Sequence, residues 1–108
     1  MSSVYTLPIP ISFSKSALTY RFSTEYGDIS FSMTFVPDDG GEEEIVIPSC
    51  RVESDECHIS GTIDIETTGT IMLIWDNSYS WFVEKKLTYY IEVEQVKNLY
   101  EFMILIFQ

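Results

Sequence analysis

Most of the chain alternates between apolar and polar residues with a period of two. Successive side chains of a β-strand point to opposite faces, so this pattern predicts strands that bury one face and expose the other. In the first clear run, Leu18, Tyr20 and Phe22 share one side. The runs with this pattern are LTYRFS (18–23), ISFSMTFV (29–36), ISGTIDIE (59–66) and LTYYIEVE (87–94).

Two further segments predict strands of a different kind. TIMLIW (70–75) is apolar on both sides, which is typical of a central strand covered on both faces or of an inner strand at the most crowded part of a sandwich. YTLPIPI (5–11) predicts an edge strand, because Pro8 and Pro10 have no amide hydrogen to donate to a neighbour. Turn-forming residues recur about every dozen positions, so we expect an all-β fold of seven or eight short strands in an antiparallel sandwich or barrel.

The 108 residues suffice for one domain, and we expect residues 1–108 to form it as a single unit. Residues 96–108 form an apolar extension whose FMILIF run (102–107) is far shorter than the ~20 residues of a membrane-spanning helix. This tail could be a last strand or a short docking helix. We expect it to be covered, either by the chain itself or by a second copy. Cover by a second copy would make the protein a homodimer through this tail.

Charge narrows the choice of partners. The net charge is −11, and ten of the 17 acidic residues lie between residues 38 and 66. Such a surface repels phosphate groups, so nonspecific nucleic-acid binding is not expected. The run DDGGEEE (38–44) indicates a solvated loop. A calcium site there is a weaker alternative, because the run lacks the ligand spacing of an EF-hand.

The clearest candidates for chemistry surround His58, the one histidine, which directly follows Cys57. Neighbours on a strand point to opposite faces, so the strand interpretation separates this pair. Cys50 with His58 across a hairpin, or a metal held by Cys50, Asp55, Cys57 or His58, stays an alternative without a recognised zinc spacing. The favoured interpretation is a packed cysteine and a surface histidine.

Other catalytic patterns are weak. Ser78 and Ser80 have no histidine near them and no G-x-S-x-G elbow. Asp64 and Glu66 alternate with apolar residues, as the solvent face of a strand does. We therefore expect no enzyme, no cofactor and no bound metal. Two cysteines and an N-terminus without signal-peptide features favour a cytoplasmic chain.

Three blocks together resemble the GOLD (Golgi dynamics) domain family. They are FSTEYGDISFSMTF (22–35), CRVESDECHISGTIDIETTG (50–69) and GTIMLIWDNSYSWFVEKKLTYYIEV (69–93), and the resemblance covers about residues 4–93. The positions that match in order are Phe22, Thr24, Asp28, Ile29, Phe31, Arg51, Ser54, Gly61, Gly69, Asp76, Asn77, Ser78, Tyr79, Ser80 and Lys85.

The resemblance implies a jelly-roll-like β-sandwich that binds other proteins in membrane trafficking and has no catalytic residues. It is nearest to cytosolic members of the family, in which the domain accompanies a FYVE and coiled-coil, an acyl-CoA-binding or a CRAL-TRIO lipid-transfer region. The expected function is protein–protein interaction in Golgi or vesicle trafficking, secretion or autophagosome transport. The expected location is cytoplasmic or peripheral on Golgi or vesicle membranes, with membrane association indirect through trafficking partners.

The segment WDNSYSWFVEKKLTYY (75–90) is the candidate recognition site. Asp76, Asn77 and Ser78 are turn-forming residues whose short side chains bond nearby backbone groups. A partner could use the aromatic and basic residues that follow, or the aromatics could instead close one end of the sandwich. Strand addition at an open sheet edge is a second recognition mode. The candidate partner-binding residues are Tyr79, Trp81, Phe82, Lys85 and Lys86.

A function of another class is a lipid- or membrane-surface module. It would need Lys85, Lys86 and the FMILIF tail to act together against the overall negative charge.

Overall fold

The structure, a computed structural model, describes residues 4–78 and 86–96, and these residues form an all-β fold. Seven strands are present in the described chain, in agreement with the expected seven or eight. They are β1 (Val4–Ile11), β2 (Ser16–Glu25), β3 (Ile29–Pro37), β4 (Glu44–Val52), β5 (Ile59–Ile65), β6 (Gly69–Asp76) and β7 (Lys86–Gln95).

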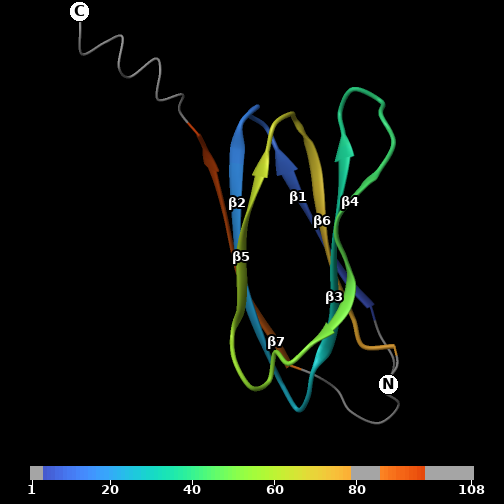
Figure 1. Cartoon of the computed structure of the whole chain (residues 1–108), viewed down its shortest axis with the longest axis vertical. Coiled ribbons are helices and arrows are strands. Elements are labelled where there is room, and N and C mark those ends of the chain that lie inside the picture. The colour runs from blue at the N-terminus through green and yellow to red at the C-terminus, as the bar shows by residue number, and fades with distance from the viewer. Residues whose placement is uncertain (1–3, 79–85, 97–108) are drawn as a thin grey trace, which may run out of the picture.

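The strands form two antiparallel sheets that face each other (Figure 1). One sheet has the order β1-β6-β3-β4 and the other the order β5-β2-β7. Only β3 and β4 are both consecutive in the chain and adjacent in a sheet; each of the other consecutive pairs is divided between the two sheets. This distribution is that of a β-sandwich, and the predicted fold class is confirmed.

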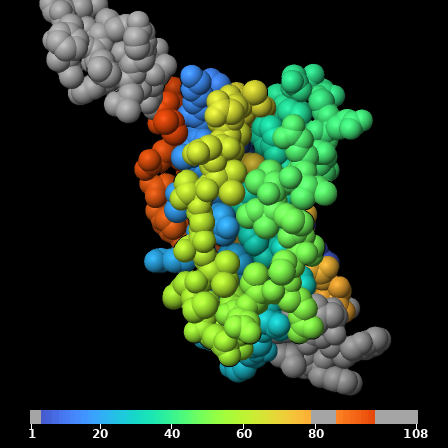
Figure 2. All heavy atoms as spheres, in the orientation of Figure 1, coloured from blue at the N-terminus to red at the C-terminus, as the bar shows by residue number. Residues whose placement is uncertain are grey.

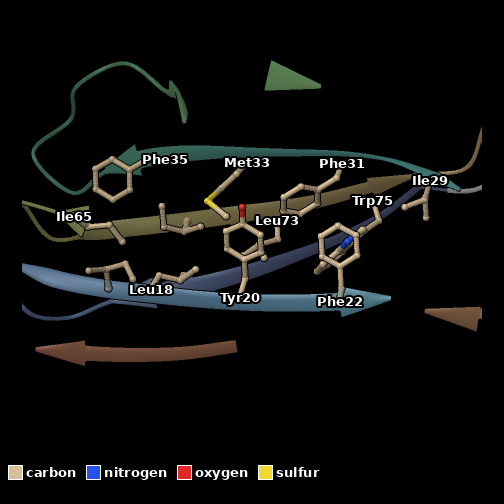
Figure 3. Packing of buried hydrophobic residues seen from close by; sticks show 12 residues of the cluster. Leu18, Tyr20, Phe22, Ile29, Phe31, Met33, Phe35, Ile65, Leu73 and Trp75 are labelled. Carbon is tan, nitrogen blue, oxygen red and sulfur yellow. The ribbon is translucent and has the colours of Figure 1, made fainter. Parts of the chain in front are cut away.

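The core lies between the sheets and is built from the alternating apolar positions. Tyr20 and Phe22 of β2 point toward Phe31 and Met33 of β3 (Figure 3). Leu18 and Met33 are fully buried, and burying one such side chain stabilises a protein by about 1.5–3 kcal/mol. The half-buried faces predicted for these two strands are therefore confirmed.

β6 is the central strand that its doubly apolar sequence predicts, since it lies between β1 and β3. Its inner residues Ile71, Leu73 and Trp75 are buried, whereas Met72 and Ile74 on the outer face are only half-buried. Of the two interpretations of this run, an inner strand of a sandwich therefore fits better than a strand covered on both faces. β1 is the predicted edge strand, and its Pro8 and Pro10 lie opposite Met72 and Thr70 of β6.

β7 departs from its expected burial. The pattern predicted that Leu87, Tyr89, Ile91 and Val93 all face the core. Leu87 and Ile91 do pack against it, but Tyr89 and Val93 are 40% and 37% exposed. The reason is that β7 lies at the edge of its three-stranded sheet, where the side of the sandwich is open.

A candidate protein-contact site

Most of the predicted recognition residues lie outside the described residues, namely Tyr79, Trp81, Phe82 and Lys85. The tail that was expected to be covered, residues 97–108, also lies outside them. Lys86 is described: it is exposed, opens β7 and lies opposite Glu25 of β2. We therefore describe the site from the residues on either side of the 79–85 segment.

The flank at the end of β6 is a turn organised by Asp76. The Ser78 backbone N–H donates a hydrogen bond of 2.7 Å to Oδ1 of Asp76, the side-chain-to-backbone contact of an Asx turn. Hydrogen bonds from Ser78 lower the pKa of the Asp76 carboxyl below its ordinary value, because they favour the charged form. Asn77, the residue between them in the sequence, is buried. Asp76 and Ser78 thus have a structural role in the turn that follows β6.

Beside this turn, three aromatic residues from three strands stack on one another. The ring of Tyr5 on β1 and that of Tyr89 on β7 each stack on the ring of Trp75 on β6, and they also lie against each other with centroids 6.2 Å apart. The ring centroids are 5.9 Å apart for Tyr5 and Trp75 and 5.4 Å apart for Trp75 and Tyr89. We call Tyr5, Trp75 and Tyr89 the tyrosine seam, because it joins the edge strands of the two sheets.

The seam is half open to solvent. Trp75 is 1% exposed, but Tyr5 and Tyr89 are 46% and 40% exposed. The two phenol oxygens lie 3.2 Å apart in a hydrogen bond, which raises the pKa of Tyr5 together with a smaller desolvation effect. Both rings are consequently held in place and present fixed aromatic faces.

The surroundings of the seam are apolar on the β1 side. β1 (VYTLPIPI) contains no charged residue, and Leu7 and Ile9 continue its inward row as half-buried side chains. Tyrosine on a rigid element offers large contact area at low entropic cost, which is why it is enriched in protein–protein interfaces. Chemically, the seam can bind an apolar or hydrogen-bonding surface.

Sequence reasoning missed Tyr5 as part of the site. It identified Tyr5 only within an edge strand and Tyr89 only as a core-facing residue, and 84 residues separate the two. A usable signal was present: an inward aromatic on a strand predicted to lie at an edge cannot be fully covered by its own sheet.

Several positions that carry the family resemblance contact one another. Phe22 and Phe31 lie across the two sheets with ring centroids 4.6 Å apart. An ion pair of 3.0 Å joins Nη2 of Arg51 to Oδ1 of Asp28, between two partly exposed side chains. These pairs join β2 to β3 and β4 to the start of β3, so the shared residues stabilise the sandwich.

The cysteine and histidine cluster shows no reactive pair. Cys50 and Cys57 are exposed free thiols, and the Cys57 thiol donates weakly to the Glu53 carbonyl at 3.9 Å. The strand argument for separating Cys57 from His58 was wrong, because both residues precede β5 in a loop. They line a shallow, open hollow of about 230 Å³. Nowhere in residues 4–78 and 86–96 do three His, Cys, Asp or Glu side chains gather as metal ligands.

Residues 38–43 of the acidic run form a turn and loop between β3 and β4, and Glu44 begins β4. The Gly41 amide donates a 2.8 Å hydrogen bond to Oδ1 of Asp39, and Gly40 has a φ of 84°, which glycine adopts without strain. Asp64 and Glu66 are exposed, as the alternation indicated.

Sequence comparisons relate the chain to segments of longer proteins. It is 36% identical over 99 residues to human FYVE and coiled-coil domain-containing protein 1, which covers 87% of this chain and 7% of that protein. It is 34% identical over 85 residues to Caenorhabditis elegans protein ctg-1, covering 75% of this chain and 22% of that protein. The mouse FYVE and coiled-coil domain-containing protein 1 is 32% identical over 99 residues.

The chain is similar to a short part of each of these proteins. No protein-family model matches it. Within the described residues, there is also no helix with the length and apolar character needed to cross a membrane.

Proposed function

We propose that this chain is a GOLD domain of the cytosolic type and acts without catalysis as a protein–protein interaction domain. Its similarity to part of the FYVE and coiled-coil protein and of ctg-1 supports the family assignment, together with the ordered match of motif positions. The proposed setting is Golgi or vesicle trafficking, secretion or autophagosome transport, in the cytoplasm or on the surface of the organelle. Membrane association is then indirect, through the partner.

One observation carries the interaction role: two tyrosines are hydrogen-bonded to each other and stacked on Trp75, yet remain about half exposed at the tyrosine seam. Their exposed faces lie at the open edge of the sandwich, beside the buried Trp75, where a partner can reach them. The partner surface that fits them is apolar with hydrogen-bond acceptors for the phenol groups. Tyr79, Trp81 and Phe82 follow Trp75 closely in sequence, and the proposed contact includes them together with Lys85 and Lys86.

Quantitative affinity capture from the native cell tests this function. The double variant Tyr5→Ser with Tyr89→Ser should lose the partners that the unchanged chain enriches. A matched control is Tyr26→Ser with Tyr90→Ser, which removes two tyrosines that are 74% and 52% exposed outside the seam. The proposal fails if the seam variant, shown to be folded by circular dichroism, keeps every enriched partner.

The same preparations address the alternative of a membrane-surface module. Flotation with neutral and phosphoinositide-containing liposomes should leave the chain unbound if membrane contact is indirect. Binding that Lys85→Ser with Lys86→Ser abolishes would favour the membrane-surface function instead. Gel filtration of the full chain would also show whether it forms the homodimer expected from its apolar tail.

A further inference from the structure

At the edge of the sandwich away from the tyrosine seam, a cavity of about 420 Å³ opens between β4 and β5. Its volume is within the ~300–1,000 Å³ range of ligand pockets. The atoms of β4 and β5 that border this edge face the viewer in Figure 2. The floor is apolar and includes core residues from both sheets: Phe35, Val46, Ile63, Ile65 and Ile71.

The rim of this cavity is acidic. Asp39 and Glu42 come from the loop between β3 and β4, and Glu44 opens β4, while Asp64 and Glu66 come from β5 and the turn after it. All five carboxylates belong to exposed residues, and among the residues that the structure describes no lysine, arginine or histidine lines the cavity. An apolar floor beneath five negative charges is a combination that this fold does not need for stability, since like charges repel.

The acidic loop is fixed above the floor. The Asp38 amide donates a 3.1 Å hydrogen bond to the Thr68 carbonyl in the turn between β5 and β6. The Lys15 amide bonds the Glu66 carbonyl in the same region at 3.3 Å, although the Lys15 side chain does not line the cavity. The two acidic sides of the rim are thus tied to one end of the sandwich.

We propose that this cavity, which we call the acidic pocket, binds a lysine- or arginine-rich peptide segment of another protein through one apolar side chain. The apolar anchor would sit on the floor near Val46 and Ile63, and flanking cationic side chains would pair with the rim carboxylates. This surface is separate from the tyrosine seam, so the inference does not depend on the proposed function there.

Charge complementarity selects this occupant over the others. A second copy of the chain carries a net charge of −11 and is repelled. The tail KNLYEFMILIFQ (97–108) offers apolar anchors but one lysine against one glutamate, so it supplies no excess positive charge. A metal ion is a poor match, because the residues that the structure describes contain no group of three ligands placed to hold one.

The test uses the full chain and fluorescently labelled synthetic peptides. The probe is Arg-Lys-Leu-Lys-Arg, compared with a peptide in which glycine replaces leucine and one in which glutamate replaces every basic residue. We expect the first to bind most tightly, the glycine peptide to bind more weakly and the acidic one not at all. Binding should weaken as salt is raised, because exposed charges are screened.

Two variants and one matched control test whether the peptide binds in the acidic pocket. Glu44→Gln with Asp64→Asn should weaken the first peptide about 3- to 10-fold, and Val46→Trp, which fills the pocket, should weaken it at least as much. The control Glu92→Gln with Glu94→Gln removes the same charge from β7 at the opposite edge of the sheet.

The proposal is overturned if the control weakens binding as much as the rim variant, which would mean that the overall charge alone attracts the peptide. It is equally overturned if the glycine peptide binds as tightly as the leucine peptide. The proposal of a second protein as the occupant is also overturned if a chain ending at Val96 binds the probe much more tightly than the full chain, because residues 97–108 would then be the natural occupant.

Discussion

Thr24 and Ser54 share a buried hydroxyl–hydroxyl hydrogen bond of 2.6 Å across 30 residues of sequence. Thr24 Oγ1 also donates to the Gly27 carbonyl at 2.7 Å, so its single proton is used there and the proton between the hydroxyls comes from Ser54. The Thr24 amide bonds the Ser54 carbonyl at 3.1 Å as well. These contacts attach the loop after β4 to the end of β2, and both residues are among those that carry the family resemblance.

Removing this network should destabilise the domain measurably. Thr24→Val leaves the Gly27 carbonyl and the Ser54 hydroxyl without partners, and we expect a loss of about 1–3 kcal/mol in the free energy of unfolding. Urea unfolding measures it. Thr62→Val is the control, because it removes the exposed hydroxyl pair of Thr19 and Thr62 and should change stability by less than about 0.5 kcal/mol. Equal losses from both variants would show that burial of the network is irrelevant.

Gly61 should accept no side chain while Tyr20 lies over it. A Cβ at this position would lie 2.5 Å from the phenol oxygen of Tyr20, whose ring is packed against Phe31. Gly61→Ala should therefore cost about 1–3 kcal/mol, whereas Ser60→Ala on the exposed face of the same strand should cost little. In a Tyr20→Leu background the penalty of Gly61→Ala should largely vanish. If Gly61→Ala is equally destabilising in the Tyr20→Leu background, the cause is the backbone conformation at position 61 and not a clash with Tyr20.

Asp76 should make stability depend on acid. The folded state lowers its pKa below the ordinary 3.8, so the stabilisation is present above that pH and is lost as the pH falls through the lower folded value. Asp76→Ala should reduce stability at pH near 6 by about 0.5–1.5 kcal/mol and make a smaller difference in strong acid. Asp76→Asn retains an acceptor for the Ser78 amide and should lose less. A stability difference between Asp76→Ala and the unchanged chain that is the same at all pH values would contradict a stabilising role for the charged Asp76 carboxylate.

The pKa of the Tyr5 phenol should depend on Tyr89. The hydrogen bond to Tyr89 raises the pKa of Tyr5 above its ordinary 10.0, so Tyr89→Phe should bring it back down toward that value. Carbon-13 NMR of the labelled Tyr5 ring reports its titration. Tyr90→Phe, which removes a phenol that bonds Glu92 at 3.0 Å, should leave Tyr5 unchanged. The raised pKa also means that the stabilisation from this bond holds below pH 10 and is lost above the folded pKa of Tyr5.

Much of the fold follows from local sequence signals. Alternation identified the inner rows of β2, β3 and β5, the doubly apolar run identified β6, and the two prolines identified β1 as an edge. β4 carried no clean alternation, because its pairing with β3 shifts register twice around Met33, and a shift disrupts the period-two pattern.

The candidate sites were harder to predict because they depend on contacts across the two sheets. No local pattern brings Tyr5 beside Tyr89, and the acidic pocket joins the 38–44 run to β5 only after the sandwich closes. Local patterns predict a solvent-facing role for each acidic segment, which is correct for each segment taken alone. Their shared cavity depends on β4 and β5 both lying at edges on the same side.

Photo-crosslinking in the native cell tests the interaction role of the seam most directly. Benzoylphenylalanine would replace Tyr5 or Tyr89 in turn, and Tyr26 in the control, since Tyr26 is more exposed but lies outside the seam. We predict that the two seam positions crosslink to the same second protein and that position 26 does not. Crosslinks of equal yield from all three positions, or none from either seam position, would contradict an interaction surface at the tyrosine seam.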